Sequence, residues 1–127
     1  MGLKKFEPKE TGFHRQAINV LCDWIKNDPV TFHTTKNSEI QTEVEFKDSS
    51  GKIIFVPDIV VYIGFKELII FEVYYKSVLT GQKLMNMMDY FYAKSIKVEC
   101  YEISALDILR QIKPPKSMKT IDCIKMI

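Results

Sequence analysis

Apolar residues in the first part of the chain recur at intervals of three and four, which predicts a helix over residues 11–26. The expected buried stripe consists of Phe13, Ala17, Val20, Leu21 and Trp24. Asp28-Pro29 should end this helix, because the residue before a proline disfavours helical backbone. Residues 30–35 are short and β-branched, and we interpret them as a strand or an extended connector.

The next segment alternates between apolar and polar positions, which predicts a half-buried strand over residues 39–47. Ile40, Val44 and Phe46 should point to one side of it. The turn residues 48–51 that follow predict an antiparallel return of the chain.

Two strongly apolar strands are expected after that turn. The first, residues 53–63, is apolar on both faces apart from Asp58, so it should be central in a sheet that is covered on both sides. Gly64 marks a turn into the second, residues 68–75, which is interrupted only by Glu72.

Helical spacing returns in residues 81–94, where the expected buried residues are Leu84, Met87, Met88 and Phe91. Residues 96–103 alternate as a fourth strand, and Ser104 is a suitable cap for a short helix over 105–112. The order helix, three-strand meander, helix, strand, helix predicts an α/β protein with a mixed sheet. The last dozen residues are expected to dock on this core or to pair with another chain.

Composition limits the class of protein. With 127 residues and 46% hydrophobic residues, the chain is long enough for one domain with a real core. The net charge of +2 permits an anionic partner without requiring one. The three cysteines have no metal-ligand spacing, no apolar run is long enough to span a membrane, and the N-terminus lacks an apolar signal core. We therefore expect a cytoplasmic protein with reduced thiols and no membrane partner.

The two acids inside apolar strands are the best clue to function. If the turn between their strands is centred on Phe65, Asp58 and Glu72 face each other with Cβ atoms roughly 4.5–5.5 Å apart. Two carboxylates that close remain ionised only with a cation between them. Oxygen ligands at this separation suit Mg²⁺, which leaves its other positions to water and phosphate.

A lysine beside the acids would complete a hydrolytic site by orienting the nucleophile or by holding phosphate charge. Lys76 is one candidate, because Glu72, Tyr74 and Lys76 share one side of the strand. Lys83, near the start of the second helix, is the other.

The sequence Pro57-Asp58, followed by Glu72 after an apolar strand and then by a helix and a strand, resembles the PD-(D/E)XK nuclease superfamily. The similarity covers residues 11–104 and is greatest to the competence-protein CoiA-like branch, which begins with a histidine-bearing helix (His14 here) and has a glutamate-bearing first strand (Glu43 and Glu45 here). The cap-snatching endonucleases of segmented RNA viruses have a similar order of histidine, Pro-Asp and glutamate.

This resemblance implies a restriction-endonuclease-like α-β-β-β-α-β core within residues 1–113, followed by a tail at 114–127. It implies hydrolysis of phosphodiester bonds in DNA or RNA with Mg²⁺ or Mn²⁺. Asp58 and Glu72 would bind the metal, with Glu43, Glu45 or His14 completing the ligand set, and Lys76 or Lys83 would assist the attacking water.

The chain departs from the superfamily pattern at Tyr74, where a lysine or glutamine is expected two residues after the glutamate. Either another lysine has taken this role or the fold is catalytically degenerate and binds nucleic acid or protein. Without a metal, Asp58 would cap backbone amides near Pro57, and Glu72 would pair with Lys76 or Lys83. A third hypothesis is an assembly protein that forms a homodimer through its tail and its tyrosine-rich second helix.

Overall fold

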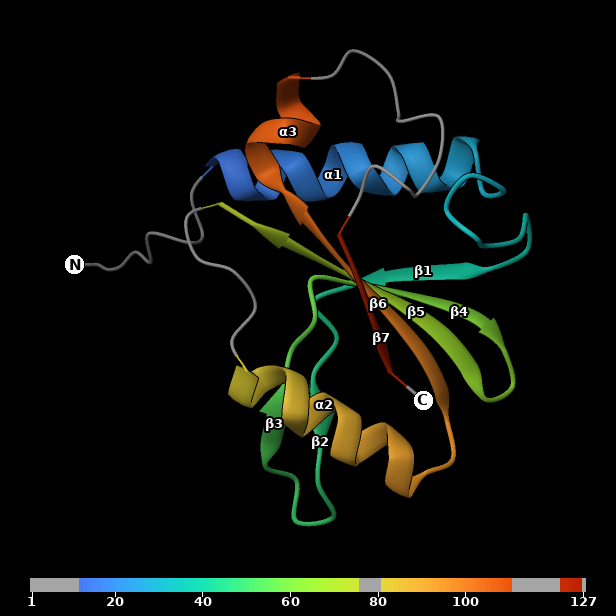
Figure 1. The fold of residues 1–127 in the computed structure, drawn as a ribbon, viewed down its shortest axis with the longest axis vertical. Helices are drawn as coiled ribbons and strands as arrows, with labels where there is room; N and C mark the ends of the chain where they lie inside the picture. The colour runs from blue at the N-terminus through green and yellow to red at the C-terminus, as the bar shows by residue number, and fades with distance from the viewer. Residues whose placement is uncertain (1–11, 76–80, 111–121, 127) are drawn as a thin grey trace, which may run out of the picture.

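The computed structural model describes residues 12–75 and 81–110, together with the backbone of residues 122–126. The helices and strands follow one another along the chain as Figure 1 shows. They are α1 (Gly12–Asn27), β1 (Glu39–Thr42), β2 (Phe46–Lys47), β3 (Ile53–Phe55), β4 (Ile59–Gly64), β5 (Glu67–Tyr74), α2 (Gly81–Ala93), β6 (Lys97–Ser104), α3 (Ala105–Arg110) and β7 (Asp122–Met126).

The main sheet has five strands in the order β1-β4-β5-β6-β7. β1, β4 and β5 form an antiparallel meander, β5 and β6 are parallel, and β7 runs antiparallel to β6. α2 makes the crossover that parallel strands require. α1 and α3 pack on one face of the sheet and α2 packs on the other (Figure 1). The prediction of an α/β protein with a mixed sheet between helices is confirmed, and β4 is an interior strand between β1 and β5, as its two apolar faces predict.

The first hairpin is bent, so two expected strands are each broken in two. The predicted strand 39–47 ends at Thr42, because Glu43 has a φ of 53° and turns the chain out of the sheet. The predicted strand 53–63 is interrupted before Ile59, since Pro57 has no amide to give to the ladder. The separated halves pair as β2 and β3 in a small second sheet.

This break also separates the apolar residues that were expected on one side of a single strand. Ile40 packs against the core under α1, whereas Val44 and Phe46 pack against the core under α2. The predicted common face of these three residues is therefore wrong beyond Thr42.

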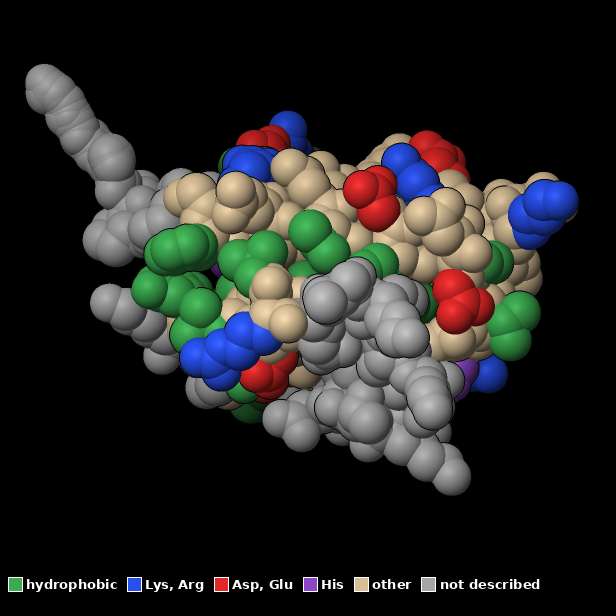
Figure 2. All heavy atoms as spheres, turned by 90° about the horizontal axis from the view of Figure 1, so that it is seen from above, with side chains coloured by type: hydrophobic (Ala, Val, Ile, Leu, Met, Phe, Trp, Pro, Cys, Tyr) green, Lys and Arg blue, Asp and Glu red, His purple; other side chains and the backbone are tan. Residues whose placement is uncertain are grey.

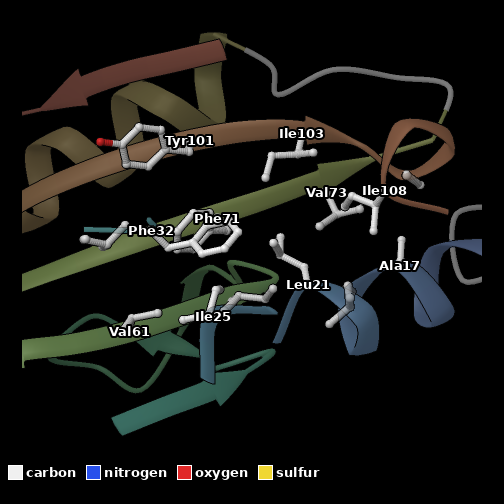
Figure 3. Close-up of a cluster of buried hydrophobic side chains, with 14 residues drawn as sticks. Ala17, Leu21, Ile25, Phe32, Val61, Phe71, Val73, Tyr101, Ile103 and Ile108 are labelled. Carbon is white, nitrogen blue, oxygen red and sulfur yellow. The ribbon is translucent and has the colours of Figure 1, made fainter. Parts of the chain in front are cut away.

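The core between the sheet and α1 contains Phe32, Phe71, Tyr101 and residues from both helices (Figure 3). The buried residues of α1 are His14, Ala17, Ile18, Leu21 and Ile25. The predicted stripe was right for Ala17 and Leu21. It was wrong for Phe13, which is 51% exposed, because the helix turns His14 rather than Phe13 toward the sheet.

The core on the other side attaches α2 to the bent hairpin. Phe46, Phe55, Tyr90 and Phe91 have ring centroids 4.9 to 5.5 Å apart. Of the residues predicted to be buried in α2, Met87 and Phe91 are buried and Leu84 is partly so, but Met88 is 40% exposed. The ring cluster therefore fixes the position of α2 on the sheet.

The C-terminal part agrees with the docking alternative. Ser104 accepts the amide of Asp107 at 3.4 Å and so caps α3, as expected. β7 pairs with β6 from Glu102 opposite Asp122 to Val98 opposite Met126, which places it at the edge of the sheet. Within residues 12–75, 81–110 and 122–126, no helix has the length and apolar character to cross a membrane.

Candidate active site

Asp58 and Glu72 lie beside each other at the end of the β4–β5 pair, next to the bend in the first hairpin. β4 and β5 pair in register from Ile59 opposite Phe71 to Tyr62 opposite Leu68. One step further along this register brings Asp58 opposite Glu72, as a turn centred on Phe65 predicts. The register shift that the sequence did not reveal lies near the turn, between Tyr62 and Gly64.

The side chains of the two acids bind to the opposite strand's backbone. The amide of Asp58 donates to Oε2 of Glu72 at 3.0 Å, and the amide of Val73 donates to Oδ2 of Asp58 at 2.7 Å. The carbonyl of Asp58 accepts the amide of Glu43 at 3.0 Å. These contacts join three segments at the break in the hairpin, and they include the amide capping considered for Asp58.

Glu72 is buried, with only 7% of its surface exposed, and has Lys83 as its charged partner. Nζ of Lys83 is 2.8 Å from Oε1 of Glu72 and donates to the carbonyl of Val56 at 3.2 Å. Burial raises the pKa of Glu72, and the negative charge of Asp58 raises it further, while Lys83 acts in the opposite direction. The ionised form of Glu72 is thus maintained at a cost, as expected for a buried carboxylate beside another.

His14 approaches the same point from α1. Its side chain is 10% exposed, and Nε2 donates to the carbonyl of Val73 at 2.9 Å. The same nitrogen is 3.6 Å from Oδ2 of Asp58. α1, β5 and the residue before β4 therefore place an imidazole, a carbonyl and a carboxylate around one position.

The side chains of two other predicted site residues, Glu43 and Glu45, are not brought into this cluster. Glu43 is exposed and pairs with Arg15 at 3.0 Å, and Glu45 is exposed and lies 3.7 Å from Lys47. Lys76 is outside the described residues. Among those that are described, no three His, Cys, Asp or Glu side chains are close enough together to hold a metal ion.

The sequence did not reveal the backbone groups of this site. The carbonyls of Val56 and Val73 contact Lys83 and His14, respectively. Main-chain oxygens have no sequence signature, so only the strand register could have pointed to them. Arg15, which pairs with the side chain of Glu43, follows His14 in sequence and carried no signal of its own.

The cluster combines two carboxylates, an imidazole and two main-chain carbonyls with one ammonium group. Asp58 and Glu72 carry two negative charges and Lys83 one positive charge, so a net charge of −1 remains when His14 is neutral. Carboxylate and carbonyl oxygens are the donors that Mg²⁺ prefers, and Mn²⁺ also accepts imidazole. The donor types therefore fit a divalent metal, although both carboxylates are now occupied with backbone amides and Lys83.

Comparison with known proteins identifies no relative: the chain matches no protein-family model, and no curated protein and no solved structure is significantly similar to it.

Proposed function

We propose that this protein is a metal-dependent nuclease that hydrolyses phosphodiester bonds in DNA or RNA. One observation carries the proposal: Asp58, Glu72 and Lys83, which are distant in sequence, meet at one point, with Lys83 at 2.8 Å from Glu72. A pair of carboxylates with a lysine is a combination that can hold a divalent cation and a phosphate together.

The order of elements supports a restriction-endonuclease-like core. Apart from the small β2–β3 sheet, the chain runs α1, β1, β4, β5, α2, β6, which is the α-β-β-β-α-β order that the resemblance implies. Lys83 comes from α2, and in this proposal it has the role of the lysine that the superfamily pattern has at the position of Tyr74.

Asp58 and Glu72 would hold Mg²⁺ or Mn²⁺ in this proposal. His14 and the carbonyl of Val73 are the next groups within reach. For Nε2 of His14 to bind a metal, the ring must adopt the other tautomer, which releases the Val73 carbonyl at the same time. The metal, when bound, would activate a water molecule and stabilise the charge of the transition state.

Lys83 would have two partners at different stages. Without substrate, its ammonium group balances the charge of Glu72. With a metal on Glu72, the ammonium group would be released to bind a phosphate oxygen or to orient the attacking water. Asp58 and Glu72 keep their places because each is tied to the strand opposite.

Cleavage of labelled DNA and RNA, single-stranded and duplex, with Mn²⁺ or Mg²⁺ tests this proposal. The wild type should cleave at least one substrate, and Asp58→Asn, Glu72→Gln and Lys83→Met should each abolish most of the activity. Glu67→Gln is the matched control, because Glu67 is an exposed acid at the other end of β5. Equal activity in Glu67→Gln and Glu72→Gln, or no cleavage by the wild type, would contradict the proposal.

A second candidate is a nuclease-like scaffold that only binds nucleic acid or protein. It is favoured by the internal partners of Asp58 and Glu72, because carboxylates that already bind amides and Lys83 need no metal for their stability. This candidate predicts binding that survives EDTA and is unchanged in Glu72→Gln.

A further inference from the structure

A second surface lies at the opposite end of the main sheet from Asp58 and Glu72. It is formed by the turn between β4 and β5 and by the loop between α2 and β6, which lie side by side (Figure 1). The amide of Lys97 donates to the carbonyl of Lys66 at 2.8 Å, and Nζ of Lys66 donates to the carbonyl of Lys94 at 3.1 Å. We call Phe65, Lys66, Lys94 and Lys97 the turn patch.

The turn patch concentrates positive charge. Residues 64–67 and 92–97 contain three lysines and one glutamate, a local excess equal to the net charge of +2 of the whole chain. In the part of the chain that the structure describes, none of the three lysines has a carboxylate within ion-pair distance. The α1–α3 face differs: Figure 2, which looks onto this face, shows basic and acidic side chains interspersed.

Phe65 gives this surface an aromatic ring. It is 97% exposed, so it contributes nothing to the core, and the ammonium group of Lys66 lies 5.9 Å from its centroid. Tyr92, in the last turn of α2, is 75% exposed. Lysines that can hold phosphates and a ring on which a base can stack are the two components of sequence-tolerant binding to single-stranded nucleic acid.

We propose that the turn patch binds a single-stranded segment of nucleic acid, with a base stacked on Phe65 and phosphates on the three lysines. This inference rests on the proposed function only for the class of ligand. The six residues of β4, a length of about 20 Å, separate the patch from Asp58, so it would anchor substrate away from the bond that is cut. A membrane fits less well, since one fully exposed ring with three lysines is a small anchor and stable attachment generally takes a stronger combination of signals.

Fluorescence anisotropy with a labelled single strand, in EDTA and over a series of salt concentrations, tests the inference on the full chain. The variant with Lys66→Gln, Lys94→Gln and Lys97→Gln should bind more weakly and lower the salt slope by about 2, at roughly 0.7 for each phosphate that is no longer neutralised by a lysine. Phe65→Ala should weaken binding by about 5- to 150-fold, whereas Phe65→Tyr should retain it.

The charge-matched control carries Lys47→Gln, Lys52→Gln and Arg110→Gln, which are exposed positions on other elements. The inference is overturned if this control loses as much affinity as the patch variant, if the patch variant binds like the wild type, or if the wild type binds no single strand. Tighter binding to phosphatidylserine vesicles, lost in the same patch variants, would assign the surface to a membrane and overturn it too.

Failure of this inference can be distinguished from failure of the proposed function. Cleavage that depends on Asp58, with unchanged binding by the patch variant, would refute the turn patch alone. Binding through the patch by a protein that never cleaves would refute the nuclease alone.

Discussion

The amide of Asp58 donates a hydrogen bond to the side chain of Glu72, and Asp58 returns a bond by accepting the next amide of the same strand, that of Val73. Two like charges are thus kept close by main-chain donors that cannot move independently of the sheet. The energetic cost falls on Glu72, the more deeply buried acid, and Lys83 offsets part of it. The two acids therefore contribute unequally to stability, although the sheet holds both in place by the same kind of contact.

Removal of the ammonium group of Lys83 should reveal how much stability is lost by burying an ionised Glu72. Lys83→Met should lower the free energy of unfolding at neutral pH by about 1–3 kcal/mol, less than for a fully buried pair because the Lys83 side chain is 30% exposed. Urea unfolding gives the value. The loss should shrink in acid, where a protonated Glu72 needs no cation, and the double variant Glu72→Gln/Lys83→Met should recover much of it. Equal losses at both pH values would contradict this account.

Metal binding should depend on pH through Glu72. Its pKa is higher in the folded protein than in the unfolded chain, so the folded state holds this proton more tightly. The stabilisation that this provides is fully present below the ordinary glutamate pKa and is lost as the pH rises through the raised pKa. Mn²⁺ must displace the proton, so the rise in Tm that it causes should grow over the same interval.

Thermal unfolding with and without Mn²⁺ across this pH range provides the measurement. Glu72→Gln should lose both the Mn²⁺ effect and its pH dependence, while Glu67→Gln should keep them. A pH-independent Mn²⁺ effect in the wild type would show that the metal binds elsewhere.

Two phenylalanines should differ sharply in their contribution to stability. Phe91 is 1% exposed within the ring cluster that joins α2 to the hairpin, and Phe91→Ala should cost about 3–5 kcal/mol. Phe65→Ala should change stability by less than about 0.5 kcal/mol, because this ring is 97% exposed. Urea unfolding followed by circular dichroism compares the two. A large loss in Phe65→Ala would mean that this ring packs against the protein and is not available to a ligand.

Truncation after Lys113 should destabilise the chain, because β7 covers the open edge of β6. The uncovered edge presents unpaired backbone groups, so the truncated protein should also associate in a concentration-dependent way. Sedimentation and urea unfolding report the two effects. If the full chain is instead a dimer that becomes monomeric on truncation, the tail is the homodimer contact.

The sequence revealed the parts of the fold that depend on apolar spacing. The bounds of α1, α2, β5 and β6 agree with the predicted ranges to within one residue, since their patterns reflect burial on one or two sides. The opposition of Asp58 and Glu72 was also predictable, because a hairpin places residues equidistant from its turn across from each other.

The break in the hairpin was hidden in the sequence. The alternation of apolar and polar residues continues through Glu43, and no glycine in the sequence indicates that this residue has a φ of 53°. The apolar residues before and after the break fit the same alternating pattern whether they face one core or two. His14 was a candidate only because the superfamily pattern has a histidine in its first helix. Its burial was not predicted, since it was not among the residues of α1 that were expected to face the core. A polar residue is assigned to the surface by spacing alone, and only its carbonyl partner on β5 explains why it lies inside.

The bend in the first hairpin determines which main-chain groups can bind the side chains of Asp58 and Glu72. A continuous strand would commit the main-chain polar groups around residue 58 to regular pairing, and acidic side chains there would have to compete with it. Since residues 43–45 and 56–58 lie outside the β1–β4 and β2–β3 ladders, the amide of Asp58 is available to hold the carboxylate of Glu72. The bend in the hairpin and the two acids thus occur at the same place, because the bend provides the main-chain donors that hold the acids.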